Sequence, residues 1–243
     1  MRIAIIADTH GNLLALEAVL ADLRSAAADA LVNLGDLVSG GFDPAGSAAA
    51  QMGLGCATVA GNHERQVLDN GPGRTDIFAR SLLSAAQLEW IGGLPRSLLL
   101  DGGAVFACHG SPAGGDLEYL LDDVSSGRSV LDRETSIRPR LIGIGAATLV
   151  LCGHSHTARV AVVDGVTILN PGSVGLPAYA DDGETPHVME AGSPHARYAV
   201  ATRRGGVWDV ELCAVGYDWE AASAQAEANG FALHARWAAT GRA

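Results

Sequence analysis

Apolar segments alternate with helical segments through the first sixty residues, and this alternation restricts the fold more than any other feature. The apolar runs at residues 2–7, 30–34 and 56–59 are short and bounded by polar residues, as buried strands are. Between them, residues 13–26 carry apolar side chains at helical spacing, and a shorter helix is expected at 44–52. Strands that alternate with helices indicate an α/β fold on a mostly parallel sheet.

The remainder of the chain predicts antiparallel strand pairs. Asp101-Gly102-Gly103, Asp164-Gly165 and Gly205-Gly206 each separate two apolar runs, as the turns of β-hairpins do. Parallel strands first and hairpins later indicate two sheets packed together, with the helices outside. Further elements are expected at residues 84–91 and 218–229 (helices), 148–152 (strand) and 116–140 (helix and loop).

The composition is that of a globular protein. Of the 243 residues, 48% are hydrophobic and 18% are charged, and no linker, repeat or low-complexity block interrupts the chain, so a single domain over residues 1–243 is expected. The apolar run at the N-terminus ends at Asp8 and is too short for a secretion signal or a membrane span. Four cysteines without a C-x-x-C pair are typical of reduced thiols, so a cytoplasmic location is expected.

The charge balance restricts the partners. Sixteen basic residues against 27 acidic ones give a net charge of −11. Binding to duplex nucleic acid or to an anionic membrane depends on clustered Lys and Arg, so neither partner is expected. A small phosphorylated substrate, such as a nucleotide, remains compatible because a bound metal ion can reverse the local field.

Five polar motifs directly follow predicted strands. In α/β sheets, ligands bind in the crevice beyond the carboxyl ends of the strands, so these motifs are expected to meet in one place. The motifs are Asp8-Thr9-His10, Gly35-Asp36, Gly61-Asn62-His63-Glu64, Cys108-His109-Gly110 and Gly153-His154-Ser155-His156.

The side chains in these motifs form a plausible ligand set for two metal ions. Four imidazoles, two carboxylates and one amide, without a thiolate, suit Mn, Fe, Zn, Ni or Co better than Ca or Mg. Seven ligands are too many for one tetrahedral ion but suit two ions that share a carboxylate, about 3.5–4 Å apart. With a bridging hydroxide, such a centre has a charge of roughly +1, which matches a phosphate. The predicted ligands are Asp8, His10, Asp36, Asn62, His109, His154 and His156.

In this order, the motifs resemble those of the calcineurin-like metallophosphoesterase superfamily. The resemblance extends from Asp8 to Pro177, and the run from Asn170 to Gly175 resembles a signature of its small bacterial phosphodiesterase branch. It implies a four-layer αββα sandwich of two mixed β-sheets flanked by helices. It also implies hydrolysis of a phosphodiester, of cyclic or dinucleotide type, or of a small phosphomonoester by a hydroxide that bridges two metal ions.

The resemblance also implies a role for each motif residue. Asp36 would bridge two divalent ions, with manganese favoured. His63 would not bind metal but would contact the scissile phosphate and assist the leaving oxygen, a proton-transfer role for which histidine is suited. The first ion would be bound by Asp8, His10 and His156, and the second by Asn62, His109 and His154.

Several further residues are candidates for supporting roles. Arg65 and Asn12 are candidate substrate contacts, although a solvated position at the start of a helix is the simpler interpretation of Arg65. Ser111 and Tyr179 could line the pocket, and Glu64 is expected to orient a neighbouring ligand. His187, His195 and His234 lie outside the motifs, so surface or loop positions are expected for them.

Two features depart from the pattern of the superfamily. The run after Gly35-Asp36 lacks the Asp-Arg pair of the protein-phosphatase members, which argues against a protein Ser/Thr phosphatase. Residues 178–196 are longer than expected and form either a substrate-side loop or a tolerated surface insertion. Two rival functions stay open: a binding scaffold of the same fold without catalysis, and a DNA nuclease, which the acidic charge disfavours.

Overall fold

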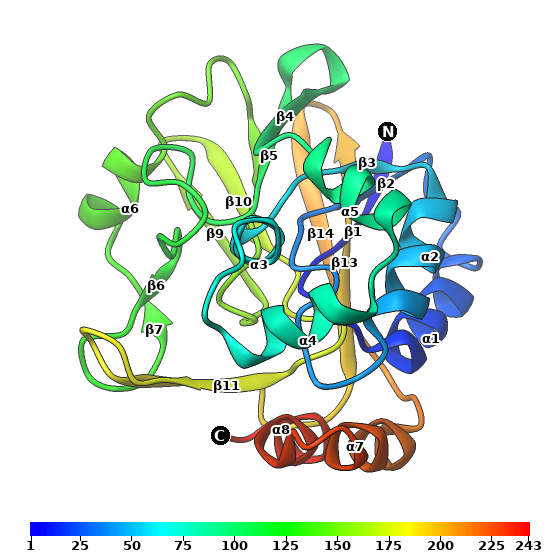
Figure 1. Ribbon diagram of the computed structural model, residues 1–243. Coiled ribbons are helices and arrows are strands. Elements are labelled where there is room, and N and C mark those ends of the chain that lie inside the picture. Colours follow the sequence, from blue (N-terminus) through cyan, green and yellow to red (C-terminus); the bar gives the residue numbers. More distant parts are fainter.

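The protein forms two five-stranded mixed sheets packed face to face, with helices on both outer faces (Figure 1). The computed structural model describes residues 1–243. The strand order is β14-β13-β1-β2-β3 in the first sheet and β4-β5-β8-β10-β9 in the second. This arrangement confirms the predicted αββα sandwich.

Each sheet has a parallel centre and antiparallel edges. In the first sheet β1, β2 and β3 are parallel, and the hairpin of β13 and β14 pairs antiparallel with β1. In the second sheet β5, β8 and β10 are parallel, and β4 and β9 pair antiparallel at the two edges. The strands are β1 (Arg2–Ile6), β2 (Ala30–Asn33), β3 (Ala57–Thr58), β13 (Ala196–Arg204) and β14 (Val207–Val215), then β4 (Ser97–Leu100), β5 (Val105–Cys108), β8 (Leu149–Leu151), β9 (Arg159–Val163) and β10 (Val166–Asn170).

Alternation along the strands divides the core into layers. Ile3 and Ile5 of β1 point to the interface between the sheets, where they pack with Leu149 and other residues of the second sheet. Ile6 points to the other face, where it packs with Leu16 of helix α1 (Leu13–Leu23). Both faces of the central strands are therefore buried, which explains why they read as continuous apolar runs.

Local capping fixes the start of several helices. The side chains of Asn12, Asp43, Ser84 and Asp218 each accept a hydrogen bond from a backbone N–H three residues later, as N-caps do. No helix has both the length and the apolar composition needed to cross a bilayer. The other helices are α2 (Pro44–Leu54), α3 (Asn62–Leu68), α4 (Arg74–Leu82), α5 (Ala85–Gly92), α6 (Glu134–Arg140), α7 (Trp219–Ala228) and α8 (Ala232–Thr240), with a 3-10 turn at Asp101–Gly103.

The predictions omitted the helices α4 and α8 and were incomplete in two further segments. Residues 116–140 contain α6 but also a small hairpin of β6 (Asp122–Asp123) and β7 (Val130–Leu131). Residues 178–196 are not only a loop, because β11 (Ala178–Asp181) and β12 (His187–Glu190) form a hairpin next to α8 (Figure 1). Strands of two to four residues carry too little periodic signal to be predicted, since their stability comes from contacts distant in the sequence.

Candidate metal centre

The carboxyl ends of strands from both sheets meet at one edge of the sandwich. There, Asp8, His10, Asp36 and His156 form one cluster in which the ligand atoms all lie within 4.8 Å of one another. Asp36 also belongs to a second cluster with His109 and His154. The carboxylate of Asp36 is therefore common to two groups that are placed to bind metal, as the prediction of a bridging carboxylate requires.

Asn62 completes the second group. Its Oδ1 lies 3.1 Å from Nε2 of His109, which in turn lies 3.2 Å from Oδ2 of Asp36. Asn62 is the first residue of α3, directly after the loop that follows β3. The structure thus brings all seven predicted ligands together, from loops that follow five different strands.

The backbone at these residues is unusual. Asp8, His10, Asp36, His154 and His156 all have positive φ angles, between 50° and 67°. Residues other than glycine seldom adopt this region, and such strain is concentrated at functional sites. The surrounding hydrogen bonds, including His10 N to Asp36 O at 2.9 Å, hold the two loops in place.

The glycine of the Gly35-Asp36 motif is required by the approach of two loops. Gly35 has a φ of +94°, and a Cβ atom there would lie 2.4 Å from the backbone nitrogen of Gly61. A side chain would therefore separate the loop that carries Asp36 from the loop that carries Asn62.

The hydrogen bonds of the first cluster leave unprotonated nitrogens that face each other. Nδ1 of His10 lies 2.6 Å from the carbonyl of Ser39, and Nδ1 of His156 lies 2.5 Å from the carbonyl of Leu176. Because a carbonyl can only accept, each Nδ1 carries the proton and each Nε2 carries a lone pair. The two Nε2 atoms are 2.9 Å apart, and the nearby Oδ2 of Asp8 is buried without any hydrogen-bond partner. Such converging acceptors are satisfied by a cation, so this donor set fits a metal ion.

The second cluster is oriented in the same way. Nδ1 of His109 donates to the carbonyl of Leu34 at 2.8 Å, which leaves Nε2 to face Asp36 and Asn62. Nε2 of His154 lies 3.2 Å from the carbonyl of Leu117, so Nδ1 is its free nitrogen. Backbone carbonyls therefore fix the tautomer of all four histidines.

Burial is the main influence on the protonation of these histidines. It lowers the pKa of His10 to about 4 and that of His154 to about 3, and it lowers the pKa of His156 well below its usual value. Neutral imidazoles are the form that binds metal. Burial also raises the pKa of Asp8 to about 8, so a nearby cation would favour its ionised form.

His109 differs because it lies against Asp36. Burial lowers its pKa, but the charge of Asp36 and the hydrogen bond to it outweigh this effect and raise the pKa to about 10. Burial likewise raises the pKa of Asp36, but His109 and His63 hold it well below its usual value. In the metal-free protein, a proton on His109 thus supplies the positive charge that a metal ion would supply.

Glu64 connects the loop that carries Asp36 with the loop that carries Asn62. Its carboxylate is fully buried and accepts three backbone N–H groups, those of Asp36, Leu37 and Gly61, each at 2.8 Å. The expectation that Glu64 orients a neighbouring ligand agrees with these contacts, which position the backbone on both sides of the shared carboxylate.

His63 lies beside the cluster and pairs with an acidic residue that the sequence did not indicate. Its Nδ1 is 2.7 Å from Oδ1 of Asp76, a buried residue of α4. Burial lowers the pKa of His63, but Asp36 and the hydrogen bond to Asp76 together raise it to about 9. No acidic side chain directly follows Gly35-Asp36 in this chain. The carboxylate that pairs with His63 comes instead from Asp76 on α4.

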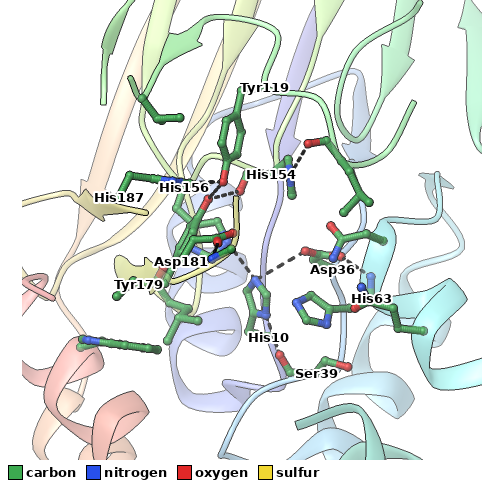
Figure 2. A pocket seen from close by; sticks show the side chains of 18 of the residues that line it. His10, Asp36, Ser39, His63, Tyr119, His154, His156, Tyr179, Asp181 and His187 are labelled. Atoms are coloured by element: carbon green, nitrogen blue, oxygen red, sulfur yellow. Dashed lines mark hydrogen bonds and ion pairs between the residues drawn. The ribbon is translucent and has the colours of Figure 1, made fainter. Parts of the chain in front are cut away.

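A cavity of about 740 Å³ opens above the clusters (Figure 2). Its inner part is lined by His10, Asp36, Asn62, His63 and other motif residues. Its outer wall comes from residues outside the motifs: Tyr119, Tyr179, Asp181, His187, His234 and Trp237 among them. The volume is within the range of about 300–1,000 Å³ that is usual for ligand pockets.

The outer wall contacts the predicted ligands directly. The hydroxyl of Tyr119 lies 2.8 Å from that of Tyr179 and 3.0 Å from Nε2 of His187. Tyr179 donates to the backbone carbonyl of His154 at 3.2 Å, and the ring of Tyr119 stacks on the imidazole of His154. The β11–β12 hairpin is therefore part of the site, which decides between the two interpretations of residues 178–196.

The expected positions of two histidines were wrong. The expectation of surface or loop positions is wrong for His187, which is 7% exposed and lies in the cavity wall, and His234 also lines the cavity. Only His195 lies away from the cavity, next to the ring of Trp219. In the structure, Tyr179 pairs with Met189 and Asp181 pairs with His187. The spacing of two residues between Tyr179 and Asp181, and again between His187 and Met189, is the sequence signal that could have revealed the hairpin.

Three of the residues considered as pocket contacts are engaged elsewhere. Arg65 forms two hydrogen bonds with Asp116, at 2.9 and 3.1 Å, and does not line the cavity. The amide of Asn12 is buried and donates to the carbonyl of Gly175, and Ser111 donates to Glu118. A direct contact of Arg65 with substrate would thus require it to leave Asp116.

A family model places this fold and site among the phosphoesterases. Residues 1–191 match the calcineurin-like phosphoesterase superfamily domain, well over half of the chain, and the protein therefore belongs to this family, which depends on divalent metals.

The chain is also similar to two solved structures and to one sequenced protein. The chain is similar to a metallophosphoesterase from Sphaerobacter thermophilus, with a TM-score of 0.74 and 25% identity over 99% of this chain and 100% of the other. A hypothetical protein from Pyrococcus horikoshii OT3 has the same fold, with a TM-score of 0.75 and 16% identity over 99% and 98%. An uncharacterized protein from Methanocaldococcus jannaschii is 28% identical over an alignment of 207 positions, which covers 72% of this chain and 76% of the relative.

Proposed function

We propose that the protein hydrolyses a phosphodiester, of cyclic or dinucleotide type, or a small phosphomonoester, with two divalent ions bound, manganese favoured. The observation that carries this proposal is the convergence of imidazole nitrogens and carboxylates on two positions that share Asp36. Asp8, His10 and His156 would hold one ion, and Asn62, His109 and His154 the other. When bound, the ions would neutralise charge on the phosphate and lower the pKa of the attacking water.

His63 is the residue best placed to assist the leaving group. Asp76 occupies its Nδ1, so Nε2 is the nitrogen available to the cavity that it lines. With a pKa of about 9, the ring carries a proton at neutral pH. As the oxygen of water bonds to phosphorus and the ester P–O bond breaks, Nε2 gives its proton to the leaving oxygen.

Hydrolysis of two chromogenic substrates tests the proposal. Metal-stripped protein receives Mn, Ni, Zn or Mg, and the release of p-nitrophenol is followed from p-nitrophenyl phosphate and from bis-p-nitrophenyl phosphate. We expect metal-dependent turnover that favours the diester. Two bound ions per chain without turnover of either compound would instead leave a highly selective enzyme or a binding scaffold of this fold.

A further inference from the structure

The cavity contains no permanently cationic side chain. None of its 21 lining residues is Arg or Lys, and the chain as a whole has no lysine. Arg65 is held by Asp116 at 2.9 Å, and Arg159 is held by Asp122 at 2.7 Å. A second or third phosphate group would therefore find no positive partner in the outer part of the cavity, beyond the metal clusters and the adjacent His63.

The histidines of the outer wall do not replace the missing cations. Nδ1 of His187 donates to the carbonyl of Thr185 at 2.6 Å, and its Nε2 contacts Tyr119, so neither nitrogen is free for a ligand. Burial lowers the pKa of His234 to about 4, which leaves this ring neutral.

The β11–β12 hairpin adds negative charge to the outer wall. Asp181 and Glu184 both line the cavity. Residues two apart on a strand share a face, so Asp181 lies on the same face as Tyr179, which contacts the imidazole of His156. Figure 2 shows Asp181 beside Tyr179 among the side chains that line the cavity. A phosphate beyond the first would meet these carboxylates and be repelled.

The same wall offers good contacts to an uncharged ring-bearing group. The rings of Tyr119, Tyr179 and Trp237 provide apolar faces, and the carboxylates can accept hydrogen bonds from hydroxyl or amino groups. A nucleoside has both a ring system and such donors, and the cavity volume of about 740 Å³ is ample for one.

We propose that the site selects esters with a single phosphate whose organic part is uncharged and of nucleoside size, and that Asp181 and Glu184 exclude substrates with further phosphates. This specificity rests on the proposed function, because the single phosphate is the one that the metal clusters would bind.

A matched series of substrates tests the selection. Two adenosines joined by one phosphate are compared with diadenosine di-, tri- and tetraphosphate, using the metal-loaded full chain and chromatographic detection of products. We expect kcat/KM to fall roughly tenfold or more between one phosphate and four. Equal or faster turnover of the tetraphosphate would overturn the proposal.

Variants of the hairpin test whether its carboxylates cause the preference for substrates with one phosphate. In the double variant Asp181→Asn, Glu184→Gln, we expect the preference for one phosphate over four to shrink by roughly fivefold or more. Asp182→Asn is the matched control, because Asp182 lies in the same hairpin but does not line the cavity. An unchanged preference in the double variant would contradict the assignment.

A binding measurement separates this inference from the proposed function. Calorimetry with AMP and ADP on the metal-loaded protein needs no turnover, and we expect AMP to bind more tightly. Tighter binding of ADP would overturn the selection even in an active enzyme. If no ester is hydrolysed but AMP still binds more tightly, the selection stands and the hydrolase function fails.

Discussion

At the scale of single residues, Asp36 is the side chain on which both metal-binding clusters depend. Its Oδ2 lies 3.2 Å from Nε2 of His109 and 3.7 Å from Nε2 of His10, so one carboxylate serves both clusters. Its Oδ1 accepts the backbone N–H of His63 at 3.1 Å. The arrangement of the two clusters therefore depends on both the charge and the position of this side chain.

Replacement of Asp36 should remove both metal ions. In Asp36→Asn the amide keeps the shape but loses the negative charge that two cations would share, so we expect metal content to fall well below two per chain and kcat/KM to fall at least about 100-fold. Elemental analysis and the chromogenic diester provide the measurements, and circular dichroism checks folding. Full metal content and activity in this variant would refute the two-ion site.

Asp76 should act through His63. In Asp76→Asn the loss of charge lowers the pKa of His63, which loses its proton, and its activity as an acid, as pH rises through that value. The alkaline limb of the pH–kcat profile should therefore move to lower pH, with kcat at pH 8 reduced about tenfold or more.

Two comparisons distinguish this positioning role from a general loss of stability. Asp69→Asn, an exposed carboxylate at the end of α3, should leave the profile unchanged. Metal content and KM should be unchanged in Asp76→Asn. A profile that keeps its alkaline limb would show that Asp76 does not control His63.

At the scale of elements, the site depends on how loops and helices are tied together. The start of α3 and the loop after β2 share Glu64, and the β11–β12 hairpin reaches the histidine loop after β8 through Tyr179. These connections explain how residues with positive φ angles are held in place.

Glu64→Gln tests the connection between α3 and the loop after β2. A glutamine can accept with only one oxygen, so its NH₂ group would face a backbone N–H, which should destabilise the metal-free fold by about 1–3 kcal/mol. Metal affinity should fall about 10–100-fold. Urea unfolding and metal titration measure the two effects, with Glu17→Gln on the exposed face of α1 as the control. A variant with unchanged metal affinity would show that Glu64 does not orient the ligands.

At the scale of the whole molecule, metal binding should stabilise the fold. Both sheets contribute ligands, so an ion joins the two halves of the sandwich. At 100 times the dissociation constant a site contributes about 2.7 kcal/mol, or roughly 5–10 °C in Tm for a chain of this length. Scanning fluorimetry with Mn, and with EDTA as the control, measures the shift, and its absence would argue against both sites.

The stabilisation should weaken as pH falls. His109 has a raised pKa of about 10, so below that pH it holds a proton that a metal ion must displace. Each bound ion at the second cluster then releases about one proton, and the association constant should fall about tenfold per pH unit on going from pH 8 to pH 6. Chelator competition at several pH values measures this slope, and an affinity independent of pH would contradict the ligand role of His109.

The sequence by itself determined the sheets and the ligand motifs. Buried parallel strands are read from local apolar runs, and the carboxyl ends of such strands lie at one edge of their sheet, so Asp8, Asp36 and Asn62 could be expected to meet. The caps Asn12 and Ser84 are likewise local, because each accepts a hydrogen bond from a backbone N–H three residues later.

Only the tertiary structure decided what surrounds the ligands. Asp76 pairs with His63 from a separate helix, Tyr119 meets Tyr179 across 60 residues, and Arg65 is neutralised by Asp116 across 51. Each contact joins polar side chains that have no periodic pattern, so their partners depend on how loops pack against the finished sandwich. The ligand motifs follow from local sequence, whereas the wall of the cavity follows from packing between segments far apart in the chain.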